Sequence, residues 1–284
     1  MKIAVTAASG KLGEAIIQEL LALHPKEEVI GLARTPEKAA HLGVEVRPGD
    51  YNDFGELEQS LRGIDVLLLV SGMDAPDKRI PQHRNVIQAA QNCGVKKIVY
   101  TSIQGPEERT AFSPIVESNR QTEQDVMASG LEWVIGRNGI YIEPDVEYID
   151  SYIQEGGIRN CAGDSKCGYT TRMELAYAYA KMLIEEGHHA KIYNLHGKAI
   201  SQAELAAYLN AAFDAQLTYT AISAEQFKQE RIAELGEFIG TVVTGIYQGI
   251  NGGAFDNESH YRDATGREHQ SWEAYFDSVR PETN

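Results

Sequence analysis

The sequence contains few cysteines and no long apolar run. Three cysteines occur in 284 residues, and their spacing matches no pattern of zinc ligands. A small, odd number of cysteines is typical of a reducing compartment. No apolar stretch approaches the roughly 20 residues that a membrane-spanning helix requires. The chain enters a predicted strand at Lys2–Val5, which leaves no room for a secretory signal. We therefore predict a cytoplasmic protein with no membrane partner.

Basic residues are scarce relative to acidic ones. Lys and Arg number 26 against 41 Asp and Glu, so the formal net charge is −15. A surface of this sign repels polyanions, which disfavours nucleic acid and anionic membrane surfaces as partners. Greater solubility is the ordinary consequence of such acidity, and the charge by itself indicates no function.

What the sequence does contain is a regular alternation of apolar and amphipathic segments. Segments rich in branched apolar residues are predicted strands, at 3–6, 28–33, 44–47, 64–70, 97–101 and 131–135. Predicted helices separate them, at 12–23, 36–41, 54–61, 82–93 and 114–129. Strands joined by helices of this length form a parallel sheet with right-handed crossovers and helices on both faces. The predicted fold class is α/β, a Rossmann-type doubly wound parallel sheet.

The alternation breaks after Gly139. Residues 140–167 show no regular pattern and are predicted to be irregular, and a helix at 173–186 and a strand at 191–195 follow. Helical patterns then cover 202–211, most of 221–247, and 272–279. We predict a first domain at 1–139, to whose sheet 168–200 returns. The remainder, 140–167 and 201–284, is predicted to be a smaller, mainly helical C-terminal region.

A glycine-containing loop joins the first predicted strand to the first predicted helix. Gly10 and Gly13 stand at the second and third positions of a G-x-x-G-x-x-G pattern, and Ala7 stands at the first. One such glycine lets the backbone approach a pyrophosphate and another lets helix and strand pack closely, while free N–H groups at the helix start hold phosphates. Alanine should be tolerated in the turn if its φ is negative. The predicted dinucleotide contacts here are Ala7, Ser9, Gly10, Lys11, Leu12 and Gly13.

The end of the second strand favours NADP(H) over NAD(H). An NAD site places an acidic residue about 20 residues after the loop, where it binds the ribose hydroxyls. This chain has Arg34 and then Lys38 instead, and a guanidinium forms bidentate hydrogen bonds with a 2′-phosphate. Asp50, beyond the third strand, is predicted to lie near the adenine. Ligands bind at the carboxyl ends of parallel strands, so further contacts are predicted at Ser71, Gly72, Thr101 and Ser102.

Several short motifs together indicate a family. They are Ala7–Gly13, ARTPEKA at 33–39, GDY at 49–51, PQHRNVI at 81–87, YTS at 100–102, RNGIY at 137–141 and GGAFD at 252–256. In order and spacing they resemble the NmrA-like branch of the atypical short-chain dehydrogenase/reductases, especially its bacterial NADPH:quinone oxidoreductases and triphenylmethane reductases. The similarity covers most of the chain and thins between 215 and 249.

The resemblance implies which residues contact the ligands. NADPH would lie along 10–13, at Arg34, at the strand end 71–73 and along the loop 138–141. This adds Met73, Asn138, Gly139, Ile140 and Tyr141 to the predicted cofactor contacts. A small aromatic or quinone-like acceptor would lie between that loop and the C-terminal region. Tyr141 and Phe255 are candidates for the surface on which the acceptor stacks.

The proton-donating pair of carbonyl-reducing relatives is missing. Asn119 and Glu123 occupy the two positions of the expected Tyr-x-x-x-Lys motif. A literal Tyr-x-x-x-Lys occurs at 177–181, but on a later predicted helix, too far along the chain to face a nicotinamide. Reduction of a simple ketone needs an acid. A quinone instead yields a phenol-like anion whose conjugate acid has a pKa of about 10, and a cationic dye needs no acid at the reacting carbon. We assign no catalytic residue and expect positioning of the acceptor over the nicotinamide to carry the reaction.

Two functions of different classes fit these observations. The first is an NADPH-dependent oxidoreductase that transfers hydride to a quinone or similar conjugated acceptor. The alternative is a non-catalytic, NADP(H)-sensing regulatory protein of the NmrA-like type. A sugar-nucleotide epimerase is disfavoured because its chemistry needs the same missing pair. His188, His189 and His196 lack metal-ligand spacing, so no metal is predicted, and the chain is expected to be a monomer or a homodimer.

Overall fold

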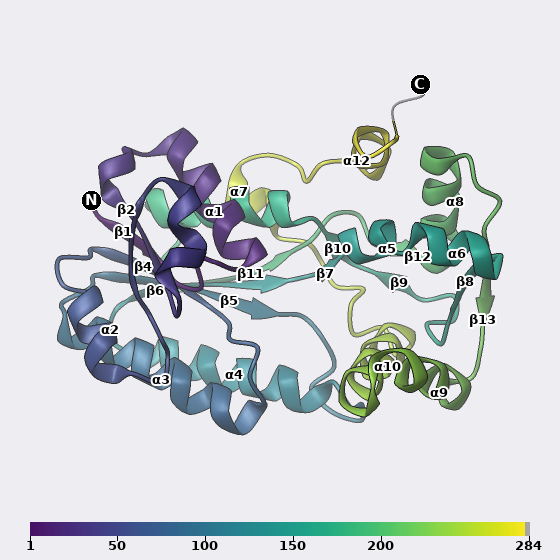
Figure 1. The fold of residues 1–284 in the computed structure, drawn as a ribbon, viewed down its shortest axis with the longest axis horizontal. Helices are drawn as coiled ribbons and strands as arrows, with labels where there is room; N and C mark the ends of the chain where they lie inside the picture. Colours follow the sequence, from purple (N-terminus) through teal and green to yellow (C-terminus); the bar gives the residue numbers. More distant parts are fainter. Residues whose placement is uncertain (282–284) are drawn as a thin grey trace.

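The computed structural model, which describes residues 1–281, contains one large parallel sheet. Its strand order is β11-β6-β5-β4-β1-β2-β3, and every neighbouring pair runs parallel (Figure 1). The strands are β1 Ile3–Val5, β2 Val29–Ala33, β3 Glu45–Pro48, β4 Val66–Val70, β5 Lys97–Ile103, β6 Glu132–Asn138 and β11 Lys191–Leu195. The prediction of a Rossmann-type α/β fold is confirmed.

Helices cover both faces of this sheet because its strands are apolar on both sides. Alternate side chains of β4 enter different cores: Leu68 faces one, and Leu67 and Leu69 face the other. The first core is closed by α1 (Lys11–Leu23) and α7 (Arg172–Ile184). The second face carries α2 (Phe54–Ser60), α3 (Pro76–Asn92) and α4 (Ser113–Met127), which line one side of the sheet in Figure 1.

Helix α3 starts six residues before the predicted start at Gln82. The sequence places Pro81 at the boundary, because proline interrupts helical hydrogen bonding. In the structure Pro76 occupies the first turn, where its fixed φ suits a helix start, and Pro81 lies inside the helix on its exposed side. Arg79 is buried in the added turn, and its guanidinium donates to Ser118 Oγ (3.2 Å) in α4. This tertiary contact stabilises the turn that local sequence disfavours.

The prediction that residues 140–167 are irregular is wrong. Short strands in this segment pair with strands far along the chain. The pairs are β7 Ile140–Tyr141 with β10 Tyr169–Thr170, β8 Gly157–Asn160 with β13 Thr218–Ala221, and β9 Lys166–Cys167 with β12 Ile200–Ser201. Two short helices, α5 (Glu143–Glu147) and α6 (Ile149–Glu155), lie between β7 and β8. Strands of two to four residues carry too little periodicity to be recognised in sequence.

The smaller region has a hydrophobic core of its own. Large side chains in it include Phe112, Tyr169, Phe255 and Trp272. Its remaining helices are α8 Gln202–Phe213, α9 Ala224–Leu235, α10 Glu237–Asn251 and α12 Trp272–Ser278, whereas α11 Tyr261–Thr265 packs into the first core of the large sheet through Tyr261 and Ala264. In Figure 1 these helices, apart from α11, lie beyond the carboxyl ends of the large sheet. None of the helices in residues 1–281 is both long and apolar enough to span a bilayer.

Candidate cofactor and acceptor site

The loop between β1 and α1 turns tightly at Ala7. The φ of Ala7 is +49°, in the left-handed region, so the condition of a negative φ is not met. The Ala8 N–H donates to Leu32 O and the Gly10 N–H to Ala7 O, both at 2.9 Å, and these bonds hold the turn. An alanine in this conformation costs about 1 kcal/mol relative to an unstrained one. A Cβ at Gly13 would collide with the Ala7 carbonyl oxygen, so glycine is required there for close helix–strand packing.

The start of α1 is open to an anionic ligand. Gly10 is the N-cap and supplies no side-chain hydrogen bond to the first turn. The amide groups of that turn are therefore available for phosphate oxygens, and the helix dipole favours negative charge at the same place. Ser9, Gly10 and Lys11 are exposed, whereas Leu12 is half-buried. The local geometry fits a bound pyrophosphate.

Basic side chains follow β2 at the same edge of the sheet. Arg34 and Lys38 are both exposed, and neither forms an ion pair within residues 1–281. They are thus available for a 2′-phosphate. Lys11 Nζ lies 3.4 Å from a carboxylate oxygen of Glu147 in the smaller region. Asp50 is half-buried, and its carboxylate accepts from the backbone and side chain of Asn52, both at 2.9 Å.

The backbone of the loop after β4 is fixed by hydrogen bonds to buried side chains of β5 and α3. The Ser71 N–H donates to Thr101 Oγ1 (2.8 Å), and the Gly72 N–H donates to His83 Nε2 (2.9 Å). His83 is therefore neutral, with its other ring nitrogen donating to Thr122 Oγ1 (2.9 Å). Burial, assisted by the nearby Arg79 charge, lowers the pKa of His83 to about 3. Sequence reasoning missed His83, although it stands in the PQHRNVI motif.

Met73, in contrast, extends into solvent. Its side chain is 95 % exposed, more than any other large apolar side chain in residues 1–281. Isolated exposed apolar residues are common, but Met73 follows Ser71 and Gly72 at the carboxyl end of β4, where the cofactor is predicted to lie. Its role as a cofactor contact stays a prediction.

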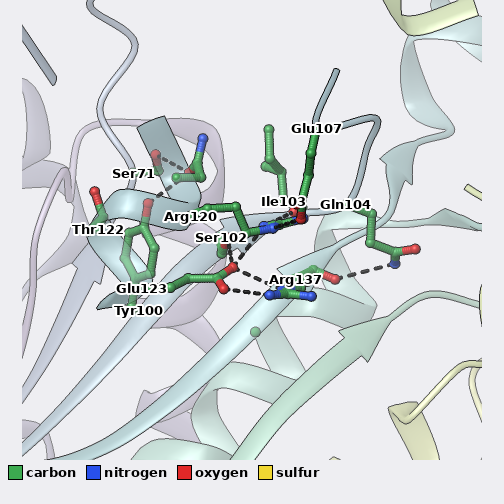
Figure 2. A network of polar contacts seen from close by, with 12 residues as sticks. Ser71, Tyr100, Ser102, Ile103, Gln104, Glu107, Arg120, Thr122, Glu123 and Arg137 are labelled. Atoms are coloured by element: carbon green, nitrogen blue, oxygen red, sulfur yellow. Dashed lines mark hydrogen bonds and ion pairs between the residues drawn. The ribbon is translucent and has the colours of Figure 1, made fainter. Parts of the chain in front are cut away.

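The two positions of the missing catalytic pair are occupied by buried, fully engaged side chains. Asn119 Oδ1 accepts from Tyr100 OH (2.7 Å) and Ser71 Oγ (3.0 Å). The Glu123 carboxylate accepts from Ser102 Oγ (2.6 Å), from two nitrogens of Arg137 (2.9 and 2.6 Å) and from Arg120 (2.8 Å), as Figure 2 shows. Asn119 is 1 % and Glu123 2 % exposed. Asn119 and Glu123 thus link α4 to the ends of β5 and β6, and neither could act as a tyrosine-like proton donor.

The literal Tyr-x-x-x-Lys motif lies on α7, which packs on the opposite face of the sheet from α4. Arg267 covers the ring of Tyr177 at 4.1 Å, and Lys181 forms an ion pair with Glu185. Tyr179 is fully buried, and its hydroxyl lies 2.5 Å from Asn138 Oδ1 and 3.0 Å from Gly136 O, two acceptors in β6. These contacts show the motif in a structural role.

The loop after β6 holds one of the two predicted stacking residues near the sheet edge. Tyr141 is half-buried, with its hydroxyl 3.5 Å from Asn138 Nδ2 and the Arg172 guanidinium 5.5 Å from its ring centre. Burial raises the pKa of Tyr141 to about 12. The Gly139 N–H donates to Leu195 O (3.0 Å), which joins this loop to β11. Ile140, in β7, is half-buried.

The other predicted stacking residue, Phe255, belongs to the core instead. Its side chain is 0 % exposed and stacks on Phe112, with ring centres 6.4 Å apart. It presents no surface to an acceptor in this structure. The GGAFD motif therefore marks a packing contact that sequence alone could not separate from a binding surface.

The parallel sheet, the open helix start after β1 and the free basic side chains after β2 define a dinucleotide-binding protein. The NAD(P)H-binding family matches residues 7–166. The quinone oxidoreductase 2 of Escherichia coli K12 is 36% identical over 79% of this chain and 79% of its own length. The crystal structure of an NADPH-dependent quinone oxidoreductase from Escherichia coli with NADPH superposes with a TM-score of 0.90 at 30% identity, covering 98% of this chain and 99% of that one.

A second solved structure has the same fold. The triphenylmethane reductase of Citrobacter sp., complexed with NADP(H), superposes with a TM-score of 0.90 at 32% identity, covering 98% of this chain and all of that one. The chain belongs to the NAD(P)H-binding, NmrA-like branch of the atypical short-chain dehydrogenase/reductases. It is an NAD(P)H-dependent oxidoreductase related to quinone oxidoreductases.

Proposed function

We propose that this protein is an NADPH-dependent reductase that passes hydride to a quinone or a similar conjugated acceptor. The observation that carries this proposal is the lack of a proton donor at positions 119 and 123, where carbonyl-reducing relatives have tyrosine and lysine. Asn119 and Glu123 are buried and fully hydrogen-bonded, so an alkoxide left by a simple ketone would find no acid there. A phenol-like anion tolerates poor acid assistance, because its conjugate acid has a pKa of about 10.

The residues present fit NADPH. The open amides at Gly10–Gly13 suit the pyrophosphate, and the unpaired Arg34 and Lys38 suit the 2′-phosphate. When bound, this cofactor supplies the hydride. The protein's own part is to hold the acceptor against it, and Tyr141 is the predicted stacking surface. The related proteins described as NADPH-dependent and as a triphenylmethane reductase support both cofactor and acceptor class.

Three further features of the protein are predictions. They are the division of the chain at residue 139, a cytoplasmic location, and a monomeric or homodimeric state. The alternative of a non-catalytic NADP(H) sensor predicts tight cofactor binding without turnover. The experiment below separates it from the reductase.

The direct test follows NADPH oxidation by absorbance with a benzoquinone or naphthoquinone as acceptor. We expect turnover with NADPH and little with NADH. Arg34→Glu should raise the KM for NADPH about 30-fold, because a charged hydrogen-bonded contact is lost and repulsion is added. The KM for NADH should change less than about threefold, since NADH lacks the 2′-phosphate.

Arg62→Glu is the matched control. Arg62 is exposed and lies just before β4, at the amino edge of the sheet, so the same charge change occurs away from the proposed cofactor. Equal losses for NADPH and NADH in Arg34→Glu would refute the role of Arg34. Absence of turnover with any quinone, dye or conjugated carbonyl would refute the reductase.

A further inference from the structure

A cluster of Arg120, Glu123 and Arg137 lies where β5 and β6 end. Arg137 is the second-last residue of β6 and stands opposite Ser102 of β5. Glu123, from α4, lies between the two arginines, and its carboxylate contacts both (Figure 2). The carboxyl ends of parallel strands are where ligands bind, and position 123 is the lysine position of the missing catalytic pair. The cluster therefore lies beside the predicted hydride-transfer site.

In each arginine one terminal nitrogen, Nη2 of Arg120 and Nη1 of Arg137, has no hydrogen-bond partner among residues 1–281. Arg120 donates through Nε to Glu107 (2.7 Å) and through Nη1 to Glu123 and to Ile103 O (3.0 Å). Arg137 directs Nε and Nη2 to Glu123, and its Nη1 has no hydrogen-bond partner among residues 1–281. Figure 2 shows this remaining nitrogen pointing away from the carboxylate. The Arg137 side chain is 28% exposed, against 15% for Arg120, so of the two free nitrogens the one on Arg137 is on the more accessible side chain.

The buried groups of the cluster carry an excess of positive charge. Two guanidinium groups share one buried carboxylate, whose side chain is 3% exposed. The second carboxylate, Glu107, is 61% exposed, so solvent screens its charge. Excess positive charge in a partly buried site attracts an anion more strongly than the same charge in water. The free Nη1 of Arg137 is the hydrogen-bond donor through which this charge can act.

We propose that Arg137 binds the oxygen that becomes negatively charged when the acceptor is reduced; this inference rests on the proposed function. The acceptor gains a hydride, and the electrons of its conjugated carbonyl move onto oxygen as O⁻, while the cofactor is oxidised. Arg137 stabilises that O⁻, and a proton from water then completes the hydroxyl group. Glu123 is a positioning residue that holds the guanidinium in its orientation.

This role makes an acceptor-specific prediction. A neutral quinone acquires a negative charge on oxygen during hydride transfer, so it gains from the cationic donor. A cationic triphenylmethane dye becomes neutral on accepting hydride at carbon, so it gains nothing from the guanidinium and loses by charge repulsion. The ratio of quinone to dye turnover therefore reports the role of Arg137 in a way that general damage to the fold does not.

The experiment compares kcat/KM for a naphthoquinone and a cationic triphenylmethane dye in the wild type, Arg137→Gln and Arg120→Gln. Removal of one donor from a buried oxyanion hole lowers kcat about 100- to 1,000-fold, and the effect is smaller where solvent reaches the donor. We expect Arg137→Gln to lose at least about tenfold with the quinone and to keep or gain dye turnover. Arg120→Gln removes one cation from the same carboxylate and controls for the loss of charge and the unpairing of Glu123, so it should lower the ratio less than Arg137→Gln, which also removes the donor. Arg137→Lys keeps the charge and should restore part of the ratio.

A binding measurement gives a second readout independent of turnover. 4-Nitrophenol, mixed with the protein and NADP⁺, is titrated by absorbance to obtain the pKa of the bound phenol. A cationic donor lowers that pKa, by about one unit for a partly exposed site. The wild type should show the full lowering, Arg120→Gln part of it, and Arg137→Gln none.

The outcomes separate the two proposals. If the wild type reduces neither acceptor, the proposed function fails, and the nitrophenol titration alone decides the anion-binding role of Arg137. If the wild type reduces both and the ratio is the same in all variants, the role of Arg137 fails while the reductase stands. An unshifted phenol pKa in the wild type would also overturn the proposed role of Arg137.

Discussion

At the scale of single residues, the loop after β1 depends on the interplay of Ala7 and Gly13. Ala7 adopts a left-handed conformation that alanine tolerates poorly, with φ at +49°. Its carbonyl oxygen then points to where a side chain at Gly13 would begin. The strained alanine is compatible with the fold only because position 13 has no Cβ. The conformation of Ala7 and the absence of a side chain at Gly13 therefore depend on each other, although they are separate positions of the motif.

Gly13→Ala should disrupt this unit. The added methyl group would collide with Ala7 O and Ala8 Cα, so the loop must shift away from phosphate-binding geometry. We expect NADPH affinity to fall at least about tenfold and the free energy of unfolding to fall by about 1–3 kcal/mol, the usual effect of overpacking. NADPH fluorescence titration and urea unfolding measure the two effects.

Gly55→Ala is the control for the same substitution. Gly55 lies in α2, and the nearest atom to an added Cβ would be Asp53 Oδ1 at 3.6 Å, an ordinary contact. Alanine there should leave NADPH binding unchanged and raise stability by up to about 1 kcal/mol. Unchanged NADPH affinity in Gly13→Ala would show that the loop does not bind the phosphates.

At the scale of elements, the C-terminal segment is attached to the large domain through α7. Arg267 donates two hydrogen bonds, at 2.8 and 3.0 Å, to the carboxylate of Glu174 in the first turn of α7. Glu174 is 8% exposed as a side chain. Burial alone would raise the pKa of Glu174, but the hydrogen bonds and charge of Arg267 lower it below its usual range. This ion pair fixes the segment between α11 and α12.

Arg267→Ala should destabilise the protein by about 2 kcal/mol, because it leaves the Glu174 carboxylate buried without its partner. The value lies below that of a fully buried pair, since the Arg267 side chain is 40% exposed. Arg262→Ala, five residues earlier, removes a pair with Glu268 in which both side chains are about three-quarters exposed. That control should cost less than about 0.5 kcal/mol. Equal losses in urea unfolding would contradict a special role for the Glu174 pair.

At the scale of the whole molecule, the core of the smaller region contains a carboxyl group. Asp145 is 5% exposed, and its carboxylate accepts a hydrogen bond from Tyr152 OH (2.8 Å). Burial raises the pKa of Asp145 to about 6, whereas an unfolded aspartate has a pKa of about 3.9. Between these values the native state holds a proton that the unfolded state has lost. The contribution of Asp145 to stability is therefore complete below about pH 4 and is lost as the pH rises through about 6.

Asp145→Asn should remove this pH dependence, since asparagine cannot ionise and still accepts a hydrogen bond from Tyr152. Relative to the wild type, the free energy of unfolding of the variant should rise by about 2–3 kcal/mol between pH 4 and pH 8. Urea unfolding at pH 4, 6 and 8 measures the difference. The same substitution at the exposed Asp150 of α6 is the control. A difference at Asp145 that does not vary with pH would show that its carboxyl group is solvated.

Local sequence patterns were sufficient to predict the sheet, the loop after β1 and the basic residues after β2. These features depend on local physics: apolar runs form buried strands, glycines permit tight turns, and a guanidinium replaces the carboxylate of an NAD site. The absence of the Tyr–Lys pair at Asn119 and Glu123 was equally visible, because it needs only position along α4.

What Asn119 and Glu123 do instead depends on the packing of the whole chain. The positive φ of Ala7, the burial of Phe255, the link from His83 to Gly72, and the short strands of residues 140–167 all depend on partners distant in sequence. So does the cluster at Glu123, whose arginines come from α4 and β6. A side chain's burial and its hydrogen-bond partners are properties of the packed chain, because elements that are remote in sequence supply them.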